Sequence, residues 1–221
     1  MISYIVKILI TEFVTHDVKS FRVEKPSGYK YLPGQATEVT IKGMEDKIGK
    51  GPFTFTSLNE WSELEFTIKI YESGTITKEL GKLKTGDELI IHDVWGTISY
   101  QGSGVFFAGG AGVTPFIAIF RQLYRDKKLN DNKLILSNKT EKDIILKDEF
   151  EKMLGKYFIN VLTRDKTDKY YNKKVDKDLI QKLVNNFNQH FYICGPDKFV
   201  EDIHKILNEL NVSDDLIVIE K

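Results

Sequence analysis

The chain has 221 residues, 41% of them hydrophobic, and its 32 basic side chains balance 32 acidic ones to a formal net charge of zero. This composition excludes an intrinsically disordered chain, which has few hydrophobic residues and a high net charge. It also provides no overall electrostatic attraction to nucleic acid. The single cysteine, Cys194, excludes an intramolecular disulfide and a cysteine-ligated iron–sulfur cluster. We therefore expect a globular cytoplasmic protein of one or two domains.

Neither a membrane span nor a metal site is predicted. The apolar run at residues 2–10 is interrupted by Ser3 and Lys7 and is too short to cross a bilayer. It also lacks the basic start and small-residue cleavage site of a signal peptide. No metal-ligand spacing relates the four histidines, which are His16, His92, His190 and His204.

Residues 1–99 are expected to form an all-β domain, because short runs of β-branched and aromatic residues alternate there with turn signals. The clearest run, at 64–70, alternates strictly between apolar and polar side chains, which predicts one buried and one solvent-exposed face. The other predicted strands are 3–11, 18–24, 37–41, 53–57 and 88–92. Six antiparallel strands in so few residues predict a small β-barrel or sandwich.

Residues 100–221 show a different pattern, in which short apolar strands alternate with amphipathic helices. The predicted strands are 105–108, 134–137, 158–162, 191–194 and 216–219. Apolar spacing predicts helices over 113–124, 179–187 and 199–210. This order indicates βαβ units and a five-stranded parallel sheet, so ligands are expected at the carboxyl ends of its strands.

A glycine-rich segment, AGGAGVTP at 108–115, follows the first strand of this second half and begins its first helix. Glycines let backbone amides approach a phosphate closely, and a helix N-terminus adds oriented donors. Thr114 is expected as the helix N-cap and Pro115 in the first turn. The alternative for this segment alone is a tight turn without a ligand.

Two further segments contain candidate ligand-contact residues. Cys194, Gly195 and Pro196 end the fourth parallel strand, where a polarisable thiol suits contact with a flat ring, or else is simply buried packing. Residues 51–57, GPFTFTS, alternate hydroxyl and aromatic side chains along a predicted strand. An ordinary half-buried strand is the alternative there.

In their order and spacing, these three segments resemble the ferredoxin-NADP reductase superfamily, and the resemblance covers nearly the whole chain. It implies a flavin-binding β-barrel at 1–99 and an NAD(P)-binding α/β domain at 100–221. The implied activity is hydride transfer from NADPH or NADH to bound FAD, with electrons passing onward to ferredoxin, flavodoxin or another redox acceptor.

The resemblance places the family's Arg-x-Tyr-Ser/Thr flavin motif on Gly51, Pro52, Phe53 and Thr54. Phe53 is then expected to stack on the isoalloxazine ring, and Thr54 to hydrogen-bond near its hydride-accepting nitrogen. Glycine stands at position 51, where relatives carry an arginine that binds the flavin pyrophosphate, so FMN is an alternative flavin. The adjacent Lys50 is the residue that could supply the missing positive charge, as a point charge without the arginine fork. The resemblance implies further pyrophosphate contacts from Gly74, Thr75, Ile76 and Thr77.

For the nicotinamide nucleotide, the resemblance implies contacts with two motifs. The glycine element matches at Gly110, Gly112, Val113, Thr114 and Pro115, and the cysteine element at Cys194, Gly195 and Pro196. Cys194 is expected beside the reactive carbon of the nicotinamide. Thr163 and Arg164, with Ser137 and Lys139, suggest a 2'-phosphate site and a slight preference for NADPH, and Glu220 corresponds to an acidic residue near the flavin.

Two other functions fit the same residues. The chain is alternatively an electron-transfer subunit of a larger enzyme, or a module whose flavin site has degenerated at Gly51. Loss of the arginine fork removes a strong bidentate phosphate contact, which is the physical basis of the second alternative.

Overall fold

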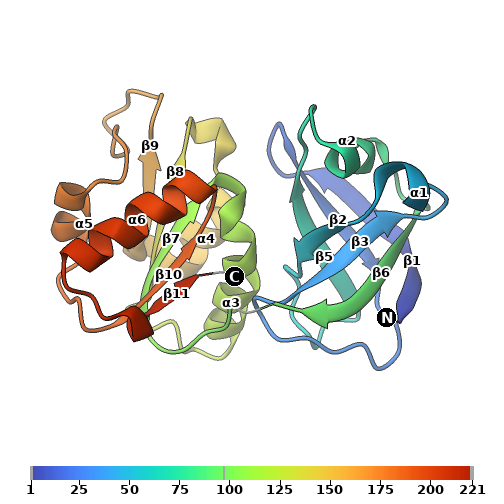
Figure 1. Ribbon diagram of the computed structural model, residues 1–221, viewed down its shortest axis with the longest axis horizontal. Helices are drawn as coiled ribbons and strands as arrows, with labels where there is room; N and C mark the ends of the chain where they lie inside the picture. Colours follow the sequence, from blue (N-terminus) through green and yellow to red (C-terminus); the bar gives the residue numbers. More distant parts are fainter. Residues whose placement is uncertain (1, 97, 220–221) are drawn as a thin grey trace. The chain divides into compact units, whose positions relative to one another are not determined.

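The structure is a computed structural model that describes residues 2–96 and 98–219. Two compact units make up the chain: Met1–Ser99 with Thr114–Gln122, and Tyr100–Val113 with Leu123–Lys221. Figure 1 colours the chain from blue at its N-terminus to red at its C-terminus. Each unit has its own sheet and its own core.

The first unit is a nearly closed antiparallel barrel, and the predicted six strands are confirmed (Figure 1). The strands are β1 (Ser3–Phe13), β2 (Val18–Glu24), β3 (Ala36–Ile41), β4 (Gly51–Thr54), β5 (Glu63–Lys69) and β6 (Glu88–Trp95). Their order is β4-β3-β6-β1-β2-β5, and a bridge between Phe55 and Phe66 joins the two ends. Two short helices, α1 (Glu45–Ile48) and α2 (Thr75–Lys82), were not predicted from apolar spacing.

Aromatic rings fill the barrel. Phe21, Phe55 and Phe66 are fully buried, and Tyr31 stacks on Phe55 with ring centroids 4.2 Å apart. Burying one such side chain stabilises the fold by about 1.5–3 kcal/mol, so these rings contribute much of the core. Burial and the loss of hydration raise the pKa of Tyr31 to about 12, and its hydroxyl lies 2.7 Å from Ser57 Oγ.

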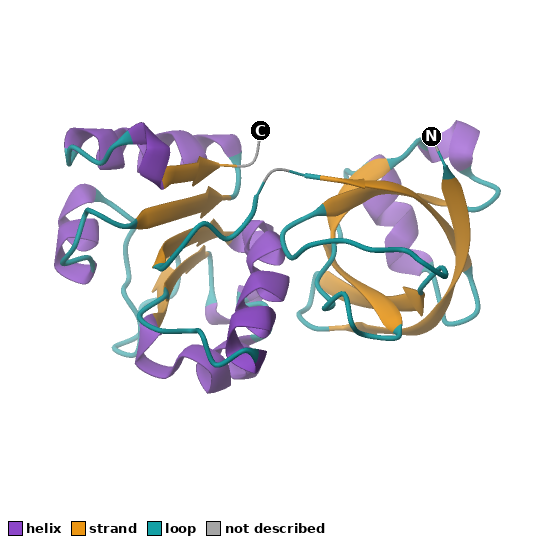
Figure 2. Ribbon diagram, turned by 90° about the horizontal axis from the view of Figure 1, so that it is seen from below, coloured by secondary structure: helices purple, strands orange, loops and turns teal. Residues whose placement is uncertain are grey.

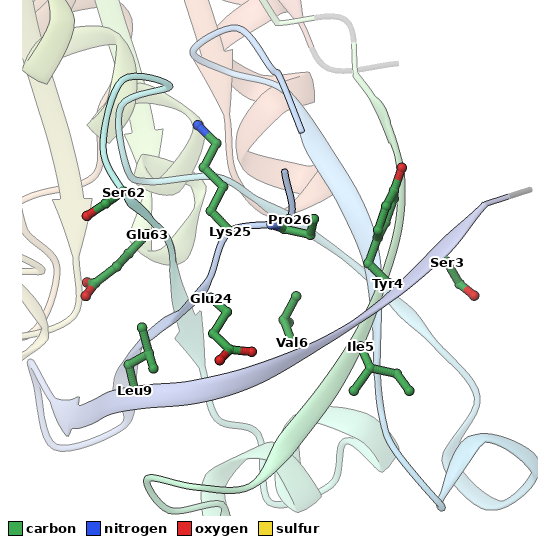
Figure 3. A pocket seen from close by; sticks show the side chains of 10 residues that line it. All are labelled: Ser3, Tyr4, Ile5, Val6, Leu9, Glu24, Lys25, Pro26, Ser62 and Glu63. Atoms are coloured by element: carbon green, nitrogen blue, oxygen red, sulfur yellow. The ribbon is translucent and has the colours of Figure 1, made fainter. Parts of the chain in front are cut away.

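Strand β1 bends, and its two parts pair with different neighbouring strands. Its first residues, Ser3–Lys7, pair with β6, and its later residues pair with β2 after a register shift between Ile8 and Ile10. A groove of about 750 Å³ lies beside this first half of β1 (Figure 3). Its lining residues are Ser3, Tyr4, Ile5, Val6, Leu9, Glu24, Lys25, Pro26, Ser62 and Glu63, none of which is a predicted flavin contact.

The prediction that the polar face of 64–70 is exposed to solvent is wrong. Glu65 is only 9% exposed and Thr67 only 5%. The Thr56 hydroxyl donates a hydrogen bond of 2.7 Å to Glu65 Oε1, and Arg121 forms an ion pair with the same oxygen. Strict alternation therefore marks two faces here, but hydrogen-bonding partners rather than water cover the polar one.

The second unit is built on a parallel sheet, as predicted. Its strands are β7 (Gly104–Gly109), β8 (Lys133–Asn138), β9 (Phe158–Leu162), β10 (His190–Cys194) and β11 (Ile217–Ile219), in the order β11-β10-β7-β8-β9. Its helices are α4 (Lys147–Leu154), α5 (Lys177–Leu183) and α6 (Asp197–Glu209). Helix α3 (Thr114–Arg125) follows β7 in the chain, and its residues Thr114–Gln122 belong to the first unit. Figure 2 shows helices on both faces of this sheet.

One face of the sheet buries the apolar sides of α5 and α6, including Leu179, Ile203 and Leu207. Helix α5 ends at Leu183, four residues before the predicted end, and α4 was not predicted. Within the described ranges, no helix is both long enough and apolar enough to cross a membrane.

Candidate functional site

The glycine-rich segment lies at the carboxyl end of β7. A 3-10 turn at Gly110–Val113 follows the strand directly, and α3 begins at Thr114. Thr114 is therefore the first residue of the α-helix and not its N-cap, because the 3-10 turn leads directly into α3. Gly110 has φ +53, a left-handed conformation that favours glycine.

The glycine turn and the cysteine motif meet backbone to backbone. Strands β7 and β10 are neighbours in the sheet, with Ala108 paired to Cys194. A Cβ atom on Gly112 would lie 2.3 Å from the Cys194 carbonyl oxygen and 2.5 Å from the Gly195 nitrogen. Only a glycine allows this approach, so two segments more than 80 residues apart in sequence form one surface at the carboxyl edge of the sheet.

A pocket of about 420 Å³ opens beside this surface, and Cys194 is half-buried in its wall. The lining residues are Ile193, Cys194, Gly195, Asp197, Val200, Glu201 and Ile219. The predicted acidic residue Glu220 lies outside the described residues. The pocket thus joins the end of β10 to the first turns of α6, where Asp197 and Glu201 give it negative charge.

The residues predicted near a 2'-phosphate also lie together. The Thr163 amide donates to the Asn138 carbonyl at 3.0 Å, and the Arg164 amide donates to the Lys139 carbonyl at 2.9 Å. These bonds continue the pairing of β8 with β9 beyond the last strand residues. Arg164 is exposed, so its guanidinium is accessible to a ligand.

An ion cluster stiffens the loop after β8. Glu141 Oε1 accepts hydrogen bonds of 2.7 Å from both Lys147 and Tyr170. These bonds, that of Lys147 above all, lower the pKa of the Glu141 carboxyl to about 2. Thr140 and Asp143 form a capping box in the same loop. The loop that carries Lys139 is thereby fixed against the one that carries Arg164.

In the barrel, the predicted flavin residues lie on β4, at one end of the strand order. Pro52 is exposed, and Phe53 and Thr54 are half-buried. A Cβ atom on Gly51 would lie 3.3 Å from Ile76 Cγ2 and 3.4 Å from the Phe53 ring. The first turn of α2 thus lies beside β4, and the Phe53 ring folds over Gly51.

The second predicted phosphate element surrounds the start of α2. Gly74 is the N-cap residue, and a Cβ atom there would lie 2.3 Å from Thr77 Oγ1. That oxygen accepts a hydrogen bond from the Tyr71 amide, which leaves the hydroxyl hydrogen to donate elsewhere. Lys50, the substitute charge at the arginine position, forms an ion pair with Glu38.

These two glycine cradles fit a phosphate-bearing flavin. At Gly74 the Thr77 hydroxyl occupies the space of a side chain, and at the buried Gly51 the Ile76 and Phe53 side chains lie close to it, so both positions suit glycine. The amide donors at the α2 N-terminus complement phosphate charge. A half-buried phenylalanine and threonine on adjacent β4 residues supply a ring and a hydroxyl, which a tricyclic ring with hydrogen-bonding nitrogens requires.

Comparison with known proteins decides the family. Residues 6–100 match the model of the oxidoreductase FAD-binding domain, and residues 106–205 match that of the oxidoreductase NAD-binding domain. The chain belongs to the ferredoxin-NADP reductase superfamily. The resemblance inferred from the three motifs is confirmed, as is FAD as the flavin of the matched domain.

Among curated relatives, "NADH-cytochrome b5 reductase 2" of Mycosarcoma maydis is 30% identical over 85% of this chain and 60% of its own length. "Cytochrome b5 reductase 4" of Rattus norvegicus is 27% identical over 96% of this chain and 46% of its own length. The chain therefore spans about half the length of the curated relatives it matches.

Solved structures share the fold. A ferredoxin NADP+ reductase from Neisseria gonorrhoeae, with bound FAD and NADP, has a TM-score of 0.84 at 18% identity and covers 98% of this chain and 97% of its own. The CS-b5R domains of human Ncb5or, in the NAD+ form, have a TM-score of 0.85 at 26% identity. The match covers 99% of this chain and 69% of that one.

Sequence reasoning missed two charged residues near the flavin segment. Glu65 and Arg121 form a buried ion pair, whereas alternation along 64–70 assigned Glu65 to solvent. Helical spacing likewise places Arg121 outside the apolar set of its helix. A local pattern does not show that two polar faces cover each other, so no signal in the sequence distinguishes this pair.

We predict that Gly112→Ala destabilises the second unit, because the added methyl group overlaps the backbone of Cys194 and Gly195. Overpacking of this kind costs about 1–3 kcal/mol. Thermal unfolding should show a lower midpoint, and alkylation of Cys194 in the folded protein should become faster. Ala111→Ser, in the same turn, should change neither quantity, and unchanged behaviour of Gly112→Ala would contradict the contact.

We predict that the Glu141 carboxyl titrates near pH 2 and that Lys147→Met moves its pKa toward the ordinary 4.5. Because the folded pKa is depressed, the contact stabilises the loop above about pH 4.5 and is lost as the pH falls toward 2. Carbon-detected NMR titration of the side-chain carboxyl measures the value. Lys152→Met, on the exposed side of α4, is the control that should leave it unchanged.

Proposed function

We propose that this protein is an NAD(P)H-dependent flavoprotein reductase, with FAD bound by residues 1–99 and the nicotinamide nucleotide by residues 100–221. The observation that carries this proposal is the backbone contact of Gly112 with Cys194 and Gly195, which brings together the two motifs proposed to bind the nucleotide. The matched FAD-binding and NAD-binding domain models support the same pairing of ligands.

Bound FAD supplies the redox chemistry, since it accepts a hydride from the reduced nucleotide and releases electrons singly or in pairs. The residues of this chain bind and orient. Thr54 is proposed to hydrogen-bond the ring near its reactive nitrogen, and Phe53 to stack on its face. Amides of Thr75, Ile76 and Thr77 are proposed to hold phosphate at the start of α2, where the helix dipole favours negative charge.

On the nucleotide side, the turn from Gly110 to Pro115 is proposed to hold the pyrophosphate, and Cys194 to Pro196 to position the nicotinamide. The half-buried thiol of Cys194 offers a polarisable surface in a pocket whose Asp197 and Glu201 carry negative charge. That charge suits a ring that becomes cationic as it loses hydride. Glu220 is proposed as an acidic residue near the flavin.

The acceptor is proposed to be a separate redox protein in the cytoplasm. Ferredoxin and flavodoxin are candidates from the family, and cytochrome b5 is a candidate from the names of the curated relatives. A second function, an electron-transfer module of a larger enzyme, is favoured by relatives in which the matched segment makes up 60% and 46% of the length. Turnover with ferricyanide but with none of the three proteins would support this second function.

The first test is the visible spectrum of the purified protein before and after addition of NADPH or NADH under anaerobic conditions. We expect flavin bands that bleach on addition of nucleotide. Cys194→Ser should slow flavin reduction about 10-fold at saturating nucleotide with little change in nucleotide affinity. The substitution should alter the position of the nicotinamide ring and not the contacts that hold the pyrophosphate. Ser213→Ala, at an exposed turn, is the control.

A colourless protein that takes up neither FAD nor FMN would contradict the proposed function and support a degenerate flavin site. A coloured protein whose Cys194→Ser variant is reduced at the wild-type rate would contradict only the role of the thiol. Release of the bound flavin by heat, followed by chromatography, distinguishes FAD from FMN.

We predict that Arg164→Ala raises the KM for NADPH about 10-fold and leaves the KM for NADH unchanged. A hydrogen bond between charged groups contributes about 1.5–3 kcal/mol, and only NADPH carries the 2'-phosphate. Steady-state ferricyanide reduction with each nucleotide gives both constants. Lys166→Ala, an exposed cation two residues on, is the matched control, and equal effects on both nucleotides would refute a 2'-phosphate site.

A further inference from the structure

Arg121 is a buried cation that the proposed chemistry does not use. Its side chain is 11% exposed, and Nη1 donates hydrogen bonds to the Thr56 carbonyl oxygen at 2.8 Å and to Glu65 Oε1 at 2.5 Å. All three residues belong to the first unit, which includes the segment Thr114–Gln122 of α3. The guanidinium therefore contacts the backbone just after β4.

Glu65 holds the same backbone from the other side. The Thr56 amide donates to the Glu65 carbonyl at 2.8 Å, and the Thr56 hydroxyl donates to Glu65 Oε1 at 2.7 Å. The Glu65 amide in turn donates to Ser57 Oγ at 2.8 Å. Arg121 completes this arrangement. It donates to the Thr56 carbonyl and to the Glu65 carboxylate, which also accepts the hydrogen bond from the Thr56 hydroxyl.

Trp61 covers the ion pair. Its ring lies 5.2 Å from the Arg121 guanidinium carbon, a cation–π distance, and Trp61 itself is 38% exposed. The pair is thus shielded from water on the side of this ring. Charged hydrogen bonds are stronger in such a setting than in water, so they fix the backbone of Thr56 more firmly.

Stability alone does not account for this pair. Two buried charges lose much of their hydration, and apolar residues of similar volume are often equally stable in their place. An apolar residue does not, however, donate a hydrogen bond to the Thr56 carbonyl. That bond fixes the chain two residues beyond Thr54, which on its other side is paired only with Ala36 of β3.

We propose that Arg121 is a positioning residue for the flavin strand. Acting through Thr56 and Glu65, it fixes the direction of the backbone after β4 and thereby sets where the Thr54 hydroxyl points. Thr56 lies two residues beyond Thr54, and Phe55 between them is held in the bridge to Phe66, so a shift of the backbone at Thr56 is transmitted to Thr54 over this short span. This inference rests on the proposed function, because it concerns the geometry of the hydroxyl at bound FAD.

The test compares three variants loaded with FAD. Arg121→Met combined with Glu65→Met removes both charges and the donor to Thr56, and approximately conserves volume. Arg121→Lys keeps a cation and a donor. Arg125→Met is the matched control, because it removes an arginine from the same helix whose partner, Asp126, lies 2.7 Å away in an exposed pair.

We expect the double variant to fold with a thermal midpoint near that of the wild type. Its rate of flavin reduction at saturating NADPH should fall between about 10-fold and 100-fold, with the KM for NADPH changed less than about twofold. The visible circular dichroism of the bound FAD should change, and amide hydrogen exchange at residues 54–57 should accelerate. Arg121→Lys should recover most of the rate and the dichroism, and Arg125→Met should match the wild type.

A folded double variant with wild-type reduction rate and dichroism would overturn the role of Arg121 while leaving the proposed function intact. If the double variant does not fold, the single variant Arg121→Met decides, because it removes the donor to the Thr56 carbonyl. A fall in the reduction rate and a change in dichroism that Arg121→Lys reverses would support the role of the donated hydrogen bond, and wild-type values in Arg121→Met would overturn it. A wild-type protein that binds no FAD would instead overturn the proposed function itself.

Discussion

The close backbone contact between Gly112 and the Cys194–Gly195 peptide is the constraint on which the surface at the carboxyl edge of the parallel sheet depends. It exists because β7 and β10 are adjacent in a parallel sheet, so the segments that follow both strands emerge at the same edge. Carbon at 2.3 Å from a carbonyl oxygen is incompatible with any side chain, so the turn requires glycine at this position. The same absence of side chains is what makes a backbone able to approach a phosphate, and packing and ligand binding therefore impose the same requirement on Gly112.

The barrel has a different constraint, because β4, the strand proposed to bind flavin, lies at the end of the strand order. Strand β4 pairs with β3, and beyond Thr54 the chain is joined to Gln35 by a backbone hydrogen bond and to β5 by the Phe55–Phe66 bridge. Backbone groups past the end of a strand need further partners. At Thr56 the Glu65 carbonyl accepts from the backbone amide, and the Arg121 guanidinium donates to the backbone carbonyl. This polar network, placed where the strand ends, keeps the backbone ordered without covering Thr54, which stays half-buried.

Much of this architecture follows from local patterns, and the failures share one cause. Alternation and helical spacing predict the six-stranded barrel and the five-stranded sheet because each depends on which face of one element is apolar. They fail at Glu65, where the polar face of β5 is buried by Thr56 and Arg121, since periodicity reports polarity and not its partners. The capping expectation fails at Thr114, because a 3-10 turn at Gly110–Val113 leads directly into the helix, and two glycines in that turn give no helix signal in the sequence.

Gly51 shows how one departure from a family motif changes the distribution of charge at a site. An arginine there would approach phosphate with a bidentate fork, whereas here the Phe53 ring lies 3.4 Å from where a side chain would start, and Lys50 is paired with Glu38. In the proposed binding mode, the amides at the start of α2 would balance the phosphate charge, as hydrogen-bond donors to an anion and through a helix dipole worth about 0.3–1 kcal/mol for each nearby charge. Amides on a helix cannot be moved separately from the backbone that carries them, unlike an arginine on a flexible side chain. The proposed phosphate contacts therefore depend on how the backbone of β4 lies beside α2, and the Thr56, Glu65 and Arg121 network fixes that backbone just beyond Thr54.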